Sequence, residues 1–187
     1  EVSKVICSNL ELNAEGVVIG AGILPNVELA LEANLECEDG ILVNEFCETK
    51  DKDIYACGDC TNHPSVLLDE RIRLESVQNA IEQAKTAVMT FLGERFPYTA
   101  TPWFWSDQYQ LKLQIAGLSR GYDQVVIRGT PTEAPFSVFY LRSGQLIAVE
   151  AVNSPKEFMI GKKLISARTS VPAERLAEVE FDLSTIV

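Results

Sequence analysis

The sequence has 187 residues, of which 47% are hydrophobic, and a formal net charge of -11. This length is enough for one core of ordinary size or two small ones, so we expect a folded globular protein. The negative charge disfavours nucleic acid and anionic membranes as partners, because both attract a positive protein surface. No apolar run approaches the roughly 18 residues of a membrane span. With no targeting segment evident, a cytoplasmic protein is expected.

The first predicted elements lie within residues 16–43. Residues 16–20 (GVVIG) are a short apolar run ended by glycine, which is typical of a buried parallel strand. A helix is predicted from a cap at Asn26 to about Ala33. Residues 41–43 (ILV) follow a glycine-containing turn and are predicted to form a second strand.

Residues 49–59 (TKDKDIYACGD) are the most informative segment of the chain. They indicate a charged turn, then a short buried strand, then a glycine and a carboxylate. Gly58 lets the backbone pass close to a ligand. Asp59 is thereby predicted at the carboxyl edge of the strands, where an open α/β sheet binds its ligand.

The cysteines allow alternative interpretations of this segment. Their number, five, is odd and no secretory signal accompanies them, so a disulfide framework is not expected. Cys57 and Cys60 have the C-x-x-C spacing of a redox dithiol, and with Cys47 and His63 they could form a zinc site. We favour a third interpretation without metal, in which the pair are small buried residues flanking Asp59 and His63 is a loop histidine. The cysteines are Cys7, Cys37, Cys47, Cys57 and Cys60.

A long amphipathic helix is predicted next. Ser76 is a suitable N-cap and Gly93 a suitable residue beyond the C-terminus. Between them, apolar residues recur at three- and four-residue steps and form one stripe, which an amphipathic helix buries. The stripe consists of Val77, Ala80, Ile81, Ala84, Ala87, Val88 and Phe91.

After Pro97 the pattern changes to closely spaced strands. Alternation of apolar and polar residues predicts a strand that buries one face, and a Ser-Gly turn predicts a hairpin. Strands followed by a helix indicate a compact antiparallel α+β domain. The expected strands are 111–115, 124–129, 136–141 and 146–152, and the expected helix is 155–168.

Two of these segments resemble a known family. Residues 49–59 fill every fixed position of T-x-x-x-D-I-Y-A-x-G-D, the second flavin motif of the FAD-dependent pyridine nucleotide-disulfide oxidoreductases. Residues 102–109 (PWFWSDQY) are similar to the ferredoxin reductases of oxygenase systems, the group of the putidaredoxin and rhodocoxin reductases. The family's Gly-x-Gly-x-x-Gly fingerprints for FAD and NAD(P) are absent from this sequence. The resemblance therefore implies the C-terminal part of a larger enzyme.

The resemblance also implies a fold and a set of cofactor contacts. The fold class would be α/β plus α+β: a remnant of an NAD(P)-binding domain at 1–20, the second half of a glutathione-reductase-type FAD domain at 21–97, and an antiparallel reductase domain at 98–187. No side chain is expected to act as a chemical catalyst. In the implied site, Asp59 bonds the ribityl chain beside Gly58, the Val77 backbone faces the pyrimidine, Trp105 flanks the flavin ring, and Gly20 and Ala21 border the nicotinamide.

The implied function is electron transfer from NAD(P)H through FAD to a [2Fe-2S] ferredoxin of a P450 or ring-hydroxylating oxygenase system. The C-terminal region contains no histidine, which argues against proton relay to a disulfide. Two alternatives stay open: a flavin reductase of the same fold with another electron acceptor, and an interaction or dimerisation module without activity. The isolated fragment is itself expected to be inactive.

Overall fold

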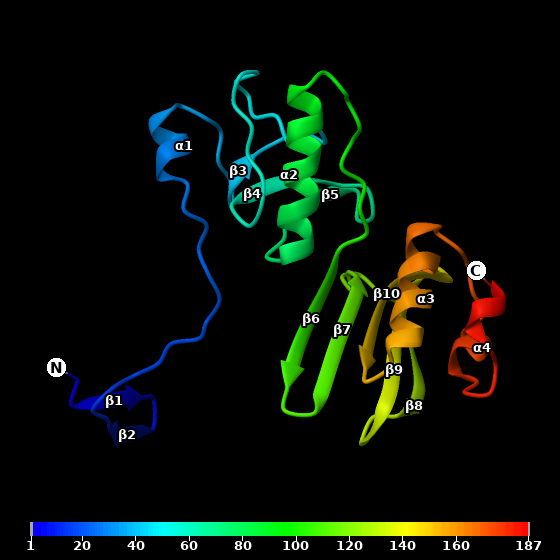
Figure 1. Cartoon of the computed structure of the whole chain (residues 1–187). Helices are drawn as coiled ribbons and strands as arrows, with labels where there is room; N and C mark the ends of the chain where they lie inside the picture. The colour runs from blue at the N-terminus through cyan, green and yellow to red at the C-terminus, as the bar shows by residue number, and fades with distance from the viewer. Residues whose placement is uncertain (1, 187) are drawn as a thin grey trace.

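The computed structural model describes residues 2–186 and contains three sheets, coloured from blue to red along the chain in Figure 1. At the N-terminus, β1 (Lys4–Cys7) and β2 (Leu10–Asn13) form an antiparallel hairpin. The chain then runs without regular structure to the short helix α1 (Glu28–Glu32). Figure 1 shows the dark-blue hairpin lying apart from the other sheets.

The strand predicted at residues 16–20 is wrong. The side chains of Val18 and Ile19 are 99% and 82% exposed, and no strand within residues 2–186 pairs with this segment. A parallel strand needs neighbours that satisfy its backbone groups, and none is present in the described part of the chain. The predicted cap at Asn26 is also displaced, because α1 begins after Val27 and no side chain caps it.

The second sheet has the order β3-β4-β5 and comprises β3 (Ile41–Leu42), β4 (Thr61–Ser65) and β5 (Glu70–Arg73). β3 pairs parallel with β4, and β4 pairs antiparallel with β5. The strand predicted at 41–43 is therefore confirmed within one residue.

The buried strand predicted just before Gly58 is not formed. Tyr55 makes only an isolated bridge with Glu48, and Cys57 is exposed to solvent rather than buried. The Thr49 amide donates to the Ile54 carbonyl over 3.1 Å. The segment is thus a tight local loop, held by its own backbone instead of by a sheet.

Helix α2 (Val77–Phe91) confirms the predicted element and its ends. The Ser76 hydroxyl accepts a hydrogen bond of 3.2 Å from the Asn79 amide, as an N-cap does. Gly93 follows the C-cap with a φ of 90°, a conformation that favours glycine.

The predicted buried face of α2 is wrong. Val77 and Phe91, at the two ends of the apolar stripe, are 56% and 73% exposed. The buried face is mainly polar, because a network of side-chain hydrogen bonds lies beneath it. Its buried residues are Gln78, Asn79, Gln83, Ala87 and Thr90.

The C-terminal domain contains an antiparallel five-stranded sheet of order β6-β7-β10-β9-β8. Helix α3 lies along one face of this sheet, and the short helix α4 lies near β8 (Figure 1). The predicted strands, hairpin and helix are confirmed, whereas β6, α4 and the final 3-10 turn were not predicted. The elements are β6 (Trp103–Gln108), β7 (Leu111–Gly117), β8 (Gln124–Thr130), β9 (Glu133–Arg142), β10 (Gln145–Val152), α3 (Pro155–Ser166), α4 (Ala173–Ala177) and η1 (Leu183–Ile186).

The core of this domain lies between the sheet and α3. Ser143 and Gly144 have φ values of 51° and 78°, which suits the tight turn that joins β9 to β10. Gly161 brings α3 close to the sheet, since a Cβ there would lie 2.6 Å from a methyl group of Val149. The core includes Phe139, Leu141, Leu146, Val149, Leu164, Ile165 and Leu176.

None of the helices within residues 2–186 is both long and apolar enough to cross a bilayer.

Candidate functional site

Gly58 and Asp59 lie against the N-terminal part of α2. Gly58 has a φ of 88°, and a Cβ at this position would lie 3.6 Å from the Cβ of Ala80. Its amide donates a hydrogen bond of 2.7 Å to Oε1 of Gln83. Asp59 is exposed, and no hydrogen bond or ion pair within residues 2–186 engages its carboxylate. The loop therefore presents a free acceptor beside the helix.

Gln83 is the centre of the network that holds this loop. Its Oε1 also accepts from the Thr61 hydroxyl over 2.8 Å, and its Nε2 lies 2.9 Å from Nδ1 of His63. Because Oε1 of Gln83 already accepts from two donors, Nε2 of Gln83 donates to Nδ1 of His63. The imidazole proton of His63 therefore lies on the other ring nitrogen, Nε2 of the histidine. One glutamine thus joins the Gly58 loop, β4 and α2.

His63 lies on β4 rather than in a loop, which corrects the prediction. Its side chain is only 2% exposed. Burial, together with the nearby charge of Arg71, lowers the pKa of His63 from 6.5 to about 4. The imidazole is therefore neutral at pH 7 and accepts from Gln83.

The network continues to the cap of α2. The Tyr98 ring packs edge-on against His63 with centroids 5.2 Å apart, and its hydroxyl donates to Oδ1 of Asn79 over 2.9 Å. Burial raises the pKa of Tyr98 to about 12. Asn79 also donates to the Leu74 carbonyl. These bonds hold the first turn of α2 in a defined position relative to Gly58.

Arg73 holds the other side of the Asp59 loop. Its Nη1 donates to the Asp59 carbonyl over 3.2 Å and to Glu75 over 2.8 Å, while its Nε pairs with Asp39 over 3.0 Å. The guanidinium thus bridges the loop, β5 and the turn before β3. This leaves the Asp59 side chain free while its backbone is held.

The N-terminus of α2 offers free donors. Within the described residues, no backbone hydrogen bond is made by the amides of Val77 and Gln78. Such amides and the helix dipole favour an acceptor or a negative charge. Together with the free carboxylate of Asp59, they fit a flavin, which carries hydroxyl donors on its ribityl chain and carbonyl acceptors on its ring.

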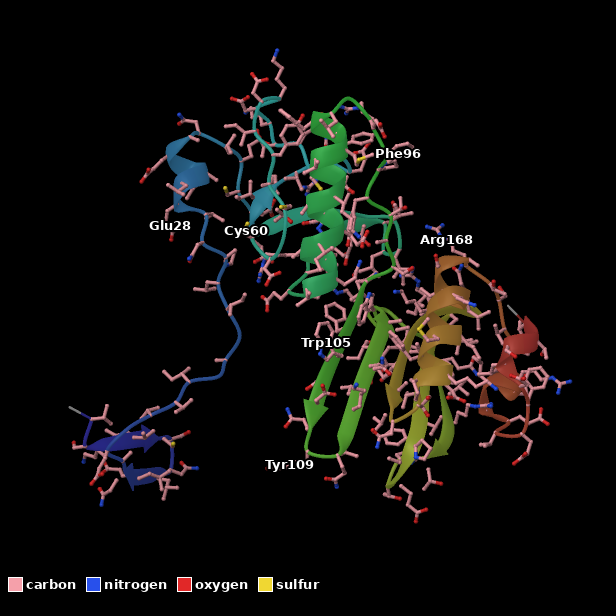
Figure 2. All side chains as sticks on the ribbon, viewed as in Figure 1. Glu28, Cys60, Phe96, Trp105, Tyr109 and Arg168 are labelled. Carbon is pink, nitrogen blue, oxygen red and sulfur yellow. The ribbon has the colours of Figure 1, made fainter. Side chains whose placement is uncertain are left out.

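Trp105 lies on β6, which contacts α2. The Trp103 amide donates to Oε1 of Gln78 over 3.4 Å, and the two indole rings lie 5.4 Å apart. Trp105 itself is 45% exposed, and Figure 2 shows it below the N-terminal end of α2. The structure therefore places Gly58 and the strand that carries Trp105 against the N-terminal half of the same helix. The roles of Asp59, Val77 and Trp105 toward a flavin stay predictions.

Gly20 and Ala21 are not part of this cluster. Both lie in the exposed N-terminal segment, and nothing lies within 4 Å of a Cβ built at Gly20. Their assignment to the nicotinamide path stays a prediction.

The geometry does not support the zinc alternative, whereas the redox dithiol of Cys57 and Cys60 stays a prediction. All five cysteines are free, and Cys57 is exposed, contrary to the prediction that it is buried. Burial raises the pKa of the Cys47 thiol to about 12. No group of three or more His, Cys, Asp or Glu within residues 2–186 is arranged to hold a metal ion.

Sequence reasoning missed Gln83, Asn79 and Arg73. A signal was present in part, because Asn79, Gln83 and Thr90 recur along one face of the helix. Such a polar stripe opposite an apolar one is normally the solvated face, and only the packing shows that it is buried.

Comparison with known proteins identifies the relatives of this chain. The sequence model of the pyridine nucleotide-disulphide oxidoreductase family matches residues 2–89, and that of the reductase C-terminal family matches residues 103–187. Putidaredoxin reductase CamA of Pseudomonas putida is 41% identical over 100% of this chain and 44% of its own length. Rhodocoxin reductase of Rhodococcus erythropolis is 39% identical over 94% of this chain and 41% of its own.

A solved structure shows the same fold. The ferredoxin reductase for the CYP199A2 system from Rhodopseudomonas palustris superposes with a TM-score of 0.93 and 43% identity, over 98% of this chain and 46% of that one. The chain thus spans less than half the length of the relatives it matches. Within that span, residues 2–89 belong to the pyridine nucleotide-disulphide oxidoreductase family and residues 103–187 to the reductase C-terminal family.

Proposed function

We propose that this chain is part of an FAD-dependent NAD(P)H:ferredoxin reductase. The observation that carries the proposal is that Gln83 holds the loop of Gly58 and Asp59 against α2, while the Asp59 carboxylate is exposed and the Val77 amide makes no backbone hydrogen bond within the described residues. When bound, FAD would supply hydride acceptance and single-electron release. The residues of this chain bind and orient it: Asp59 accepts from a ribityl hydroxyl, and the α2 N-terminus favours the negative charge of the reduced ring.

The acceptor in this proposal is a [2Fe-2S] ferredoxin of a P450 or ring-hydroxylating oxygenase system. Relatives named as ferredoxin reductases of such systems, including one for the 5,5'-dehydrodivanillate O-demethylase of Sphingobium, support it at 42% identity. A second candidate is a reductase with a different acceptor. The rubredoxin-NAD(+) reductase of Pseudomonas putida favours this candidate, at 34% identity over 81% of this chain.

The domain boundaries and the compartment belong to the same proposal. We place the end of the NAD(P)-binding portion at residue 20 and the start of the reductase domain at residue 98. Five free thiols suit a reducing compartment, which supports the cytoplasm.

FAD retention tests the proposal. Replacing Asp59 with Ala in the flavin-loaded protein should raise the dissociation constant for FAD by about tenfold, since one hydrogen bond to a charged acceptor is lost. Asp51→Asn is the control, because Asp51 is exposed in the same loop, fills no fixed position of the motif and keeps as Asn the Oδ1 acceptor for the Asp53 amide. Equal flavin content in both variants after dialysis would contradict the role of Asp59.

A turnover assay separates the acceptors. The assay uses the flavin-loaded protein at the full length of its relatives, which is given NADH and either a [2Fe-2S] ferredoxin, a rubredoxin or no protein acceptor. Preference for the ferredoxin supports the proposal, whereas preference for rubredoxin supports the second candidate. If flavin binds but no acceptor is reduced, the chain is better described as an interaction module.

A further inference from the structure

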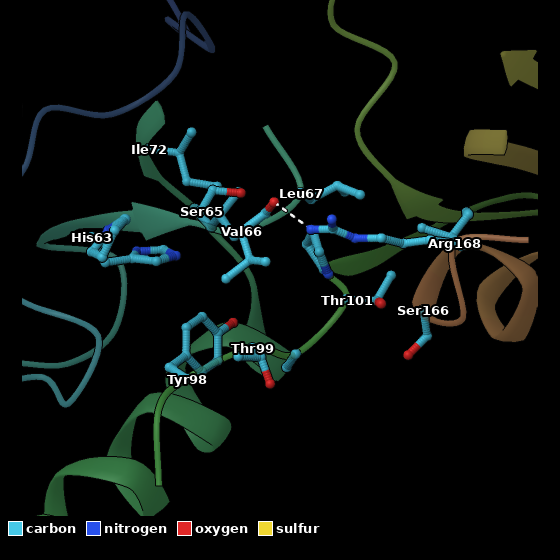
Figure 3. A pocket seen from close by; sticks show the side chains of 15 residues that line it. His63, Ser65, Val66, Leu67, Ile72, Tyr98, Thr99, Thr101, Ser166 and Arg168 are labelled. Atoms are coloured by element: carbon cyan, nitrogen blue, oxygen red, sulfur yellow. Dashed lines mark hydrogen bonds between the residues drawn. The ribbon is translucent and has the colours of Figure 1, made fainter. Parts of the chain in front are cut away.

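The tip of the β4–β5 hairpin reaches from the sheet beside α2 to the C-terminal domain. Nη2 of Arg168 donates to the Val66 carbonyl over 2.8 Å, a bond drawn in Figure 3. Nη2 of Arg142 donates to the Leu67 carbonyl over 3.4 Å. Arg168 follows α3 and Arg142 ends β9, so two separate elements of the C-terminal domain hold one turn. These four groups are called the arginine latch below.

Two further contacts support the latch. The Leu67 side chain packs against the core of the C-terminal domain. Glu70, on the same hairpin, forms an ion pair with Arg120. That pair is exposed and contributes little on its own, so the carbonyl bonds and Leu67 carry the contact.

Packing around the latch is incomplete. A cavity of about 210 Å³ lies on one side, where His63, Tyr98, Thr101 and Arg168 contribute to its lining (Figure 3). A more open hollow adjoins the same tip near Arg142. The covalent connection, residues 93–102, has no helix or strand. The tip contact therefore adds to the bonds of Tyr98 and Trp103, which also join α2 to the C-terminal domain.

β6 is the strand through which the C-terminal domain, held by the latch, contacts α2. This strand begins where the connection ends, and the Trp103 amide reaches Oε1 of Gln78 on α2. We propose that Arg142 and Arg168 are positioning residues. By donating hydrogen bonds to the Leu67 and Val66 carbonyls, they hold the C-terminal domain, and with it Trp105, beside the N-terminal turn of α2. The value of this position for electron transfer rests on the proposed function, but the mechanical role does not.

Amide hydrogen exchange of Trp103 tests the latch without any cofactor. The chain carrying both Arg142→Met and Arg168→Met keeps the aliphatic stems and loses the donors. Exchange of the Trp103 amide, followed by NMR, should become faster by up to about tenfold, the factor that corresponds to the loss of one hydrogen bond. The amide of Val149, in the centre of the C-terminal sheet, should keep its rate.

Arg175→Met is the matched control. Arg175 pairs with Glu178 and stacks on Phe181 within the C-terminal domain, away from the tip. This variant should leave the Trp103 rate unchanged. The proposal is overturned if the double variant exchanges Trp103 at the original rate, or if Trp103 and Val149 accelerate equally, which would indicate general unfolding. Failure of FAD to bind would overturn the proposed function and leave this result intact.

Discussion

Gln83→Leu is the sharpest test of the network that positions the Asp59 loop. Leucine has a similar volume but cannot accept from the Gly58 amide or donate to Nδ1 of His63, which lie 2.7 Å and 2.9 Å from the Gln83 side chain. The Thr61 hydroxyl keeps its second bond, to the Gly58 carbonyl. Two buried polar groups are thereby left without partners.

The magnitude follows from those two groups. Each buried group that loses its partner costs about 1–3 kcal/mol, and burial of the leucine side chain offsets part of the sum. We expect the free energy of unfolding to fall by about 3 kcal/mol. Urea unfolding followed by far-ultraviolet circular dichroism measures it, because α2 is the longest helix, with 15 residues.

A double-mutant cycle separates the network from general packing effects. Gln83→Leu combined with His63→Leu removes both partners of one bond, so the pair should cost less than the sum of the single variants. A loss below about 1 kcal/mol for Gln83→Leu, or strict additivity in the cycle, would refute the reasoning.

Two further predictions concern stability. His63 is the only histidine, and its folded pKa of about 4 lies below the unfolded value of 6.5. Its contribution is therefore complete above pH 6.5 and is lost as the pH falls towards 4, a difference of about 3 kcal/mol that His63→Gln should abolish when unfolding is measured across this range. Gly161→Ala should destabilise the C-terminal domain by about 1–3 kcal/mol, because the new methyl meets Val149 at 2.6 Å. Gly16→Ala, with nothing within 4 Å, is its control in the same thermal unfolding measurement, and equal midpoints would contradict the close approach of α3.

The sequence alone determined the elements whose signals are local. The cap at Ser76, the left-handed Gly93 and the Ser143-Gly144 turn depend on residues adjacent in the chain, so α2 and the β9–β10 hairpin could be located from them. The flavin motif of residues 49–59 pointed to Gly58 and Asp59 by resemblance to a family, and their contact with a flavin stays a prediction.

Only the tertiary structure decided which surfaces are buried. A stripe of apolar residues predicts burial only when a partner covers it, and within residues 2–186 the stripe of α2 is largely exposed while Asn79 and Gln83 are covered. The strand predicted at residues 16–20 does not form for the same reason, because a strand is stable only when a neighbouring strand pairs with its backbone groups. The Gln83 network and the arginine latch join residues more than 20 positions apart, such as Gly58 with Gln83 and Val66 with Arg168. Their partners are set by packing in three dimensions, which no local pattern in the sequence records.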